Sequence, residues 1–565
     1  MPFSLRTLGL AAASSVLLSA ALGAQAVSPT TSLSGTRSGE SSSVSRSGQS
    51  TPFPKGITTG EIDAHLKFLS SNLLEGRSPA TRGGQLASAY IAAALQNAGV
   101  APGGPDHSYF QSVPIDIVGA DPTSLHVTAS GKATAALRYP DDVVVGAGSA
   151  VESSAARGEL VFVGYGVAAP EHQWDDYKGV DVRGKILLVL VNDPPVAPFT
   201  KTMDYYGRWT YKYEEAERRG AAGCLIVHTT ERAGYPWHTV VGSWAKELRM
   251  LPRDPSLPPP LGVRGWITDS AASALLASAG LDMAQLRSQA SSHDFRPVAT
   301  GITMDMGFAN HVRHMQSENV IGVVKGTSLP DQYVVFSAHW DHLGIGPAVN
   351  GDSIYNGAED NASGVADVLA MARVAKSQRR SMMFLFVTAE ESGLLGSAWF
   401  AQHPTVPVTG IVANLNIDGG NLLGRVSDLN ALGDRKSSLG PSLAKYVSPM
   451  GMHLTPEAHP EQGHFYRSDH FSFAKVGVPA LSIGAGTDFV GRPKNWGVEQ
   501  EDDYTAHRYH QPSDEYRPDF DLSGAVQLSS IVLGFGESLA NAPGLPTWNA
   551  DAEFHRAGST SAAMQ

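Results

Sequence analysis

Acidic and histidine side chains stand at the ends of apolar runs in the C-terminal half of this sequence. His339 and Asp341 directly follow one such run, and the adjacent pair Glu390 and Glu391 follows another. Adjacent carboxylates at the exit of a buried strand repel each other and lose hydration, so the pair requires a cation or a shared proton. This pattern indicates a metal site.

Three further residues complete a donor set. Asp360 lies in a loop that leads into a predicted helix, Asp418 closes an apolar run, and His510 stands in a loop. Imidazoles and carboxylates without thiolates suit zinc, and two imidazoles with three carboxylates can hold two ions if one carboxylate bridges them. Two metals about 3.5–4 Å apart recur in hydrolases, where they activate a water together. Taken singly, each residue could be a helix cap, a loop charge or an ordinary polar side chain.

The elements that must position these residues alternate between strands and helices from Asn319 onward. Such alternation predicts an α/β sheet with helices on both faces and with ligands at the carboxyl ends of its strands. The expected strands cover Tyr333 to Ser337, Met382 to Thr388, Ile411 to Ile417 and Pro479 to Ile483, and the expected helices Ser363 to Ala375, Gly393 to Ala401 and Ser523 to Ala540.

Two more helices and a smaller domain are expected before this region. Thr58 and Glu61 have capping-box spacing, which predicts a helix start, and Gly99 is a typical stop for a second helix from Gln85 to Ala98. Residues 124–299 then consist of short β-rich runs with Gly, Pro and Asp between them, together with a helix near Tyr211. We interpret this stretch as a separate domain inserted between 53–123 and 300–542.

The N-terminus has the features of a secretory signal. A positive charge at Arg6 precedes an apolar stretch and the small residues up to Ala26, after which we expect cleavage, although a membrane anchor is the alternative. Residues 27–52 are rich in Ser, Thr and Gly, which predicts a flexible leader, and residues 543–565 are expected to be a polar tail. We therefore expect a periplasmic or secreted protein without stable membrane insertion.

Composition excludes some partners. The net charge of −12 and the absence of a Lys/Arg-rich stripe argue against nucleic-acid binding. The single cysteine, Cys224, excludes an internal disulfide, and its apolar neighbours favour a small buried side chain over a reactive thiol.

Five sequence blocks carry a resemblance to a known family. In chain order they are SAHWDHLG, NGAEDNASG, VTAEESGLLGS, NLNIDGG and YHQPSDEY. They resemble the co-catalytic zinc aminopeptidase family, which also contains glutamate carboxypeptidase II and the transferrin receptor. The resemblance implies a mixed sheet between helix layers, of the phosphorylase/hydrolase-like type. Residues 124–299, with GELVFVGYGV and RRGAAGCLIVH, look like the protease-associated domain that many members carry as an insert.

The resemblance also implies a role for each candidate residue and two zinc ions per chain. His339 and Asp418 would bind one zinc, Glu391 and His510 the other, and Asp360 would bridge both. Glu390 would be the general base, and the Asp341 carboxylate would hydrogen-bond His339 and fix its tautomer. Four residues near the predicted site could contact substrate or its oxyanion, or could equally be structural: Tyr509, Tyr504, Arg467 and His470.

The sequence favours an aminopeptidase that hydrolyses N-terminal residues of peptides. A carboxypeptidase for acidic C-terminal residues would need clustered arginines, and only Arg467 and Arg508 are plausible contributors. A receptor-like binding module on the same fold would have lost metal ligands, whereas all five are present. A serine hydrolase is disfavoured because Ser468, Asp469 and His470 are adjacent and cannot form a triad geometry. Side-chain preference and oligomeric state do not follow from the sequence.

Overall fold

The computed structural model describes residues 56–132, 134–200 and 203–556. The expected signal peptide and the expected leader lie outside the described residues. The described chain contains two mixed β-sheets with helices packed against them, and a single long strand, β13 (Val298–Val324), belongs to both.

The first sheet contains the strands that end at the candidate site. Its core is β17 (Arg380–Val387), β14 (Leu329–His339), β18 (Ile411–Asn416) and β21 (Ala480–Ala485), which run parallel in that order. The antiparallel strand β13 flanks β17, and β2 (Phe110–Ala120) and β11 (Leu248–Met250) follow outward. On the other side, β21 pairs with β19 (Asp428–Leu432), which in turn pairs with β20 (His453–Thr455). The short β1 (Ala101–Pro102) pairs with β13.

Alternate residues of the central strands face two different helix layers. In β17, Met382, Phe384 and Phe386 belong to an apolar core with helices α1 (Thr59–Leu69), α2 (Arg82–Asn97), α8 (Gly364–Val374), α10 (Leu439–Val447) and α13 (Ser523–Asn541). Met383 and Leu385 pack with Phe400 of α9 (Leu395–Gln402) and Phe473 of α11 (His470–Lys475). Because both faces are covered, every residue of β17 is buried. The predicted α/β sheet with helices on both faces is thus confirmed.

The second sheet lies in the stretch that the sequence assigns to an insert. In order it contains β4 (Thr134–Ala136), β3 (His126–Ser130), β13, β6 (Ser153–Phe162), β9 (Ile186–Leu190), β10 (Gly223–His228), β12 (Val263–Thr268) and β5 (Val143–Ala147). Its helices are α3 (Trp209–Arg218), α4 (Thr230–Ala233), α5 (Trp237–Trp244), α6 (Asp269–Ser278) and α7 (Met283–Ala290). Cys224 is fully buried in β10, as its apolar neighbours predict.

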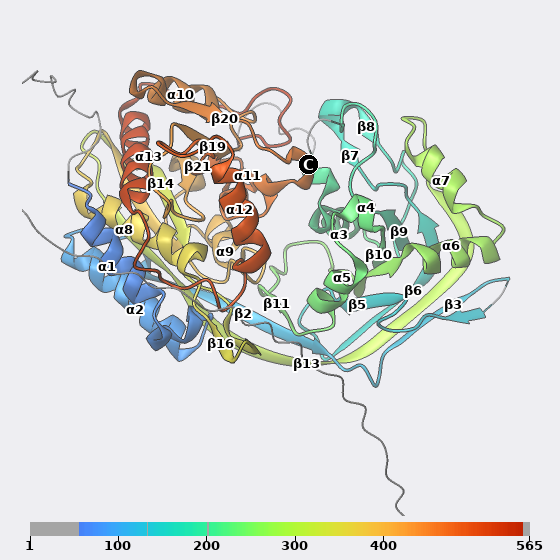
Figure 1. Cartoon of the computed structure of the whole chain (residues 1–565). Helices are drawn as coiled ribbons and strands as arrows, with labels where there is room; N and C mark the ends of the chain where they lie inside the picture. Colours follow the sequence, from blue (N-terminus) through green and yellow to red (C-terminus); the bar gives the residue numbers. More distant parts are fainter. Residues whose placement is uncertain (1–55, 133, 201–202, 557–565) are drawn as a thin grey trace, which may run out of the picture. The chain divides into compact units, whose positions relative to one another are not determined.

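The passage between the two sheets occurs within β13 rather than at a loop. Residues 298–309 pair with β6, and residues 310–320 pair with β2. Figure 1 shows this strand running from one sheet into the other. The boundary that the sequence places after Ala299 therefore falls inside a continuous strand, because a strand that crosses between sheets carries no turn signal.

The remaining helix predictions are confirmed at their ends. Thr58 caps α1 by accepting a hydrogen bond from the backbone N–H of Glu61 at 3.3 Å, and α2 stops just before Gly99, which has a positive φ. The last strongly apolar helix, α13, packs against α8 and against β14. None of the described helices is both long and apolar enough to cross a bilayer.

The C-terminal segment differs from the expected polar tail. Ala552 and Phe554 are buried, Trp548 donates its indole N–H to the backbone oxygen of Gly477, and Glu553 accepts from Lys436 Nζ at 2.8 Å. The few apolar side chains of this segment are enough to fix it, although its average composition is polar.

Candidate metal centre

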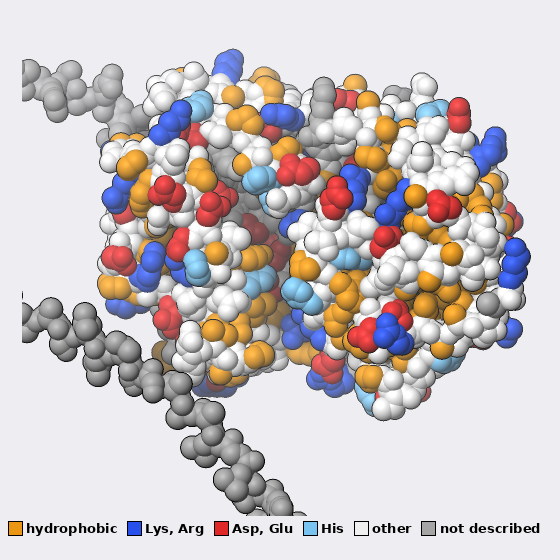
Figure 2. Space-filling view, turned by 45° about the vertical axis from the view of Figure 1, so that its right-hand side comes forward, with side chains coloured by type: hydrophobic (Ala, Val, Ile, Leu, Met, Phe, Trp, Pro, Cys, Tyr) orange, Lys and Arg blue, Asp and Glu red, His pale blue; other side chains and the backbone are white. Residues whose placement is uncertain are grey.

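The carboxyl ends of three adjacent parallel strands meet at one edge of the first sheet. His339 is the last residue of β14, the pair Glu390–Glu391 follows β17, and Asp418 follows β18. Since β17, β14 and β18 are neighbours, these side chains converge on one place. Figure 2 shows a hollow on one face of the molecule with acidic side chains on its floor.

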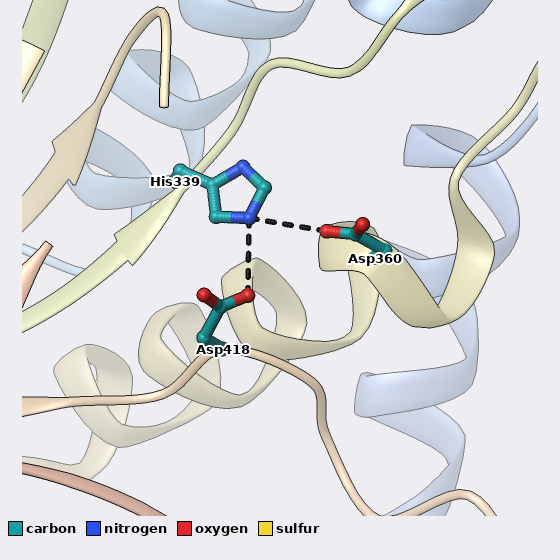
Figure 3. Close-up of side chains that lie close together, drawn as sticks. All are labelled: His339, Asp360 and Asp418. Carbon is teal, nitrogen blue, oxygen red and sulfur yellow. Dashed lines mark hydrogen bonds and ion pairs between the residues drawn. The ribbon is translucent and has the colours of Figure 1, made fainter. Parts of the chain in front are cut away.

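A first group of ligand atoms is formed by His339, Asp360 and Asp418. His339 Nε2 lies 3.1 Å from Asp418 Oδ1 and 3.2 Å from Asp360 Oδ1. In Figure 3 both carboxylates point toward the same ring nitrogen of His339. The three donor atoms are close enough to one another to surround a single cation.

A second group shares Asp360 with the first. His510 Nε2 lies 3.3 Å from Asp360 Oδ2 and 3.1 Å from Glu391 Oε2. His342 also belongs here, because its Nδ1 is 2.7 Å from Glu391 Oε1 and its ring is one member of a compact ligand group with Asp360 and Glu391. The two oxygens of Asp360 therefore face two different sets of donors, which is the arrangement of a bridging carboxylate.

The loop that carries Asp360 is held from outside the sheet. Asp514 accepts hydrogen bonds from the backbone N–H groups of Glu359 (2.9 Å) and Asp360 (3.1 Å). Asn361 donates to the backbone oxygen of Ile417 at 3.0 Å and accepts from the N–H of Gly419. These bonds fix the Asp360 loop to the segment that carries Asp418.

Asp341 acts differently from its predicted role. Its carboxylate Oδ1 accepts a hydrogen bond from the backbone N–H of Glu390 at 3.1 Å, whereas it lies 3.9 Å from His339 Nδ1. The nearest contact of that ring nitrogen is the backbone oxygen of Asp341, at 3.1 Å. Only one residue separates the two positions, so the carbonyl reaches the ring while the carboxylate orients the Glu390 turn.

The pocket is strongly charged, and most of its ionisable groups are buried. Burial raises the pKa of Glu390 well above its usual value, and the charges of Asp418 and Glu391 add to this effect while His339 opposes it. Burial likewise raises the pKa of Asp341 to about 6. Burial disfavours the ionised form of Asp360 too, but hydrogen bonds from His339 and His510 hold the pKa of that carboxyl well below its usual value.

A buried arginine lies beneath the acidic groups. Arg77 donates to the backbone oxygens of four residues, namely Leu69, Trp340, Asn356 and Gly357, at 2.6–3.0 Å. Burial lowers the pKa of Arg77 to about 10, against the charges of Asp514, Asp341, Asp360 and Glu391. The guanidinium ties the turns after α1 and β14 to the Asp360 loop and adds positive charge under the pocket.

The four candidate substrate contacts differ in their surroundings. Tyr509 is 47% exposed and stacks on His510 with ring centroids 3.9 Å apart, so it is accessible at the pocket. Tyr504 donates to Asp514 at 3.3 Å and thereby supports the Asp360 loop. Arg467 is exposed and donates to the backbone oxygen of Gln462. His470 is fully buried against Phe465, which excludes the direct substrate contact predicted for it.

Three contributors to the pocket were not singled out from the sequence. His342 stands only three residues after His339 in the block SAHWDHLG, so its position carried a usable signal. Asp514 and Arg77 act through backbone groups that are distant along the chain, and no local pattern marks such contacts. Sequence spacing finds residues at strand ends more easily than residues that hold loops together.

Comparison with known proteins identifies the family that this site region matches. Residues 319–535 match Peptidase family M28. These residues belong to that family. The matched segment contains all five candidate metal ligands and Glu390.

Two relatives of this chain have names that denote different activities. The chain is 26% identical over 339 residues to "Probable glutamate carboxypeptidase AMP1" of Arabidopsis thaliana, covering 53% of this chain and 44% of that protein. It is 37% identical over 90 residues to "Aminopeptidase YwaD" of Bacillus subtilis, covering 15% of this chain and 18% of the relative. The chain thus spans less than half the length of either relative.

Among solved structures, an aminopeptidase from Aneurinibacillus sp. strain AM-1 is similar over 87% of this chain and 96% of its own. The sequence identity is 20% and the TM-score is 0.47.

Proposed function

We propose that the chain is an exported zinc-dependent exopeptidase, and in first place an aminopeptidase that removes N-terminal residues from peptides. The observation that carries this proposal is the pair of donor groups on either side of Asp360, with Glu390 beside them. The match to peptidase family M28 supports a peptidase, and the name of the Bacillus subtilis relative supports an aminopeptidase.

The residues fit two zinc ions. The donors are imidazoles and carboxylates, which suit zinc, although cobalt or manganese could substitute. Buried polar atoms of His342 and Glu391 lack hydrogen-bond partners in the described structure, as expected of groups that face a cation. His339 and Asp418 would hold one ion, Glu391 and His510 the other, and Asp360 both. Bound there, the pair would supply an activated water and polarise the scissile carbonyl.

Glu390 is the residue in position to move protons. Its carboxyl lies close enough to His339 and Asp418 for their charges to act on it, so it is placed to accept a proton from a water bound between the donor groups. It would take a proton from the attacking water and return it to the amine that leaves. The hydrogen bond from its backbone N–H to Asp341 fixes the turn from which it acts.

A carboxypeptidase is the second candidate, and one observation favours it. The sequence offers no obvious arginine cluster, but the structure brings Arg208 of the second sheet's domain close to Arg467. The backbone N–H of Met203 donates to the oxygen of Pro460 at 2.9 Å, and the rings of Tyr205 and Tyr466 lie 5.8 Å apart. The segments that end in the two arginines therefore pack together.

Arg208 and Arg467 together could bind an anion. Burial, and then the charge of Arg467, lower the pKa of Arg208 to about 10. The Nε of Arg208 is buried without a hydrogen-bond partner, and no carboxylate of the described residues lies within ion-pair distance of either guanidinium. Arg467 is two residues from Asp469, whose charge acts on Glu390. A substrate carboxylate could be held there.

Export and the nature of the insert belong to the same proposal. The charged, apolar and small-residue segments before Ala26 support a signal peptide and a periplasmic or secreted location. The mixed sheet of residues 124–299 supports a protease-associated domain, and its Arg208 would give that domain a role in selecting substrates.

The deciding experiment compares two substrate series with purified protein, with and without chelator and added zinc. The first series is unblocked and N-acetylated aminoacyl nitroanilides, and the second is peptides with free or amidated C-termini. Chelator-sensitive cleavage of unblocked nitroanilides alone supports the aminopeptidase. Cleavage that requires a free C-terminus, and that weakens in Arg208→Ala, supports the carboxypeptidase. No cleavage by a zinc-loaded protein would overturn both and favour a binding module.

A further inference from the structure

His342 occupies a position that the five-ligand scheme does not use. It lies in the turn after β14 and is fully buried. Its ring packs directly on Gly357, where a Cβ would come within 2.5 Å of the His342 Cγ. The turn before Asp360 therefore leaves room for this imidazole only because residue 357 has no side chain. The ring centroid lies 5.8 Å from that of His510.

The polar atoms of this imidazole are unsatisfied. His342 Nδ1 is 2.7 Å from Glu391 Oε1, yet the contact is not directed as a hydrogen bond, and neither atom has another partner within the described chain. Buried polar atoms are rarely left in this state, because each lost hydrogen bond costs about 1–3 kcal/mol. A nitrogen and a carboxylate oxygen 2.7 Å apart need either a proton or a cation between them, and a cation that binds both atoms would satisfy both.

We propose that His342 is a further ligand of the metal on the side of Glu391 and His510. The inference rests on the proposed two-metal function and deepens it. The Glu391 side would then offer His342, His510, Glu391 and Asp360, whereas the other side offers His339, Asp418 and Asp360.

This asymmetry assigns different tasks to the two positions. Four protein donors fill most of the coordination sphere of a zinc ion, as in sites that mainly hold metal. Three protein donors leave a place for water or substrate, as in catalytic sites. We therefore infer that the ion beside His339 is the more exchangeable one and has the more open coordination.

The first test is X-ray absorption at the zinc edge of the fully loaded wild-type protein, which requires no variant. With His342 bound, the signal corresponds to three imidazoles for two ions, and His342→Ala and His342→Gln each reduce it to two. A wild-type signal of two imidazoles, unchanged in the variants, would overturn the proposal and leave His342 as a neighbour of Glu391.

The second test measures zinc retention against a graded series of chelator by elemental analysis. Wild-type protein should lose its ions in two steps, and the tighter step should weaken by more than about 100-fold in His342→Ala, beyond the 10–100-fold effect of an outer-shell partner. His126→Ala, an exposed histidine of the second sheet, is the matched control and should keep both steps. A tighter step unchanged in both His342 variants, with normal circular dichroism, would contradict the proposal. Wild-type protein that holds fewer than two ions would instead contradict the two-metal function itself.

Discussion

Two regions of this molecule bury several charged side chains, and they differ in what those charges face. In the metal pocket, carboxylates and imidazoles converge on one another, and atoms of Asp341, His342 and Glu391 lack hydrogen-bond partners within the described structure. Near α3 of the second sheet, Asp176 and Lys212 are equally buried, but each is satisfied. Asp176 accepts from the N–H of Val167 and from the indole of Trp174, and Lys212 donates to the backbone oxygen of Tyr165.

The difference shows that burial of charge does not by itself mark a functional site. Burial raises the pKa of Asp176 to about 6, much as it raises that of Asp341. What distinguishes the pocket is convergence of donors that remain unpaired, which a bound cation would complete. Substitutions in the pocket should therefore change metal content and turnover, and substitutions near α3 should change stability.

The largest effect is expected from Asp360→Ala. Asp360 is the residue whose two oxygens face both donor groups, so its loss should weaken zinc retention by more than about 100-fold and reduce turnover to background. Elemental analysis after gel filtration and initial rates at saturating zinc provide the measurement. If the variant kept both ions and near-normal turnover, the pocket would not be a metal site that depends on Asp360, and it would resemble the buried charges near α3.

Glu390→Gln separates chemistry from metal binding. The amide preserves shape and cannot accept a proton, so kcat should fall by about 10²–10⁴-fold while the zinc content stays that of wild type. Glu359→Gln is a matched control, since this partly buried neighbour of Asp360 has a pKa raised to about 8 and no assigned part in proton transfer. If Glu390→Gln kept its kcat, the proton acceptor would have to be another group.

The sequence predicted the elements around the pocket better than those that hold it together. Long apolar runs before His339, Glu390 and Asp418 identify strands because fully buried parallel strands are continuously apolar. The structure then brings these residues and His510 together around Asp360. Five short blocks, three of them at strand ends, were sufficient for that expectation.

Other features depend on contacts that leave no local pattern. The proximity of Arg208 to Arg467 joins residues more than 250 positions apart, and the four carbonyls bound by Arg77 come from three separate segments. The passage of β13 between two sheets also has no turn signal. Tertiary packing decides such features, so spacing along the chain could not predict them.

Asp176→Ala should affect stability and leave turnover unchanged. The substitution leaves the N–H of Val167 and the indole N–H of Trp174 without an acceptor, and each buried unpaired donor costs about 1–3 kcal/mol. Asp181→Ala is the control, because that carboxylate pairs with Arg183 at the exposed surface, where ion pairs contribute little. Denaturant unfolding and kcat with the same preparations would measure both effects. A large loss of turnover in folded Asp176→Ala would show that the charges near α3 also serve the reaction.

The smallest effect concerns the pH dependence of stability that comes from Asp204, whose backbone N–H donates to Asp193. Burial, reinforced by the charge of Glu553, raises the pKa of Asp204 to about 6 from the usual 3.8. As the pH rises, Asp204 therefore loses its proton at a lower pH in the unfolded chain than in the folded protein. The stability linked to protonated Asp204 is complete below about pH 4 and is lost as the pH rises through about 6, by at most about 3 kcal/mol.

Asp204→Asn should remove that part of the pH dependence, so its stability relative to wild type should increase from pH 4 to pH 7. Glu553→Gln should show the opposite trend. Burial disfavours the charge of Glu553, but Lys436 pairs with it and lowers its pKa, so its contribution is present at neutral pH and lost in acid. Urea unfolding of the chelator-treated proteins at four pH values gives both curves. Parallel curves for wild type and Asp204→Asn would mean that water relieves the burial of this carboxyl.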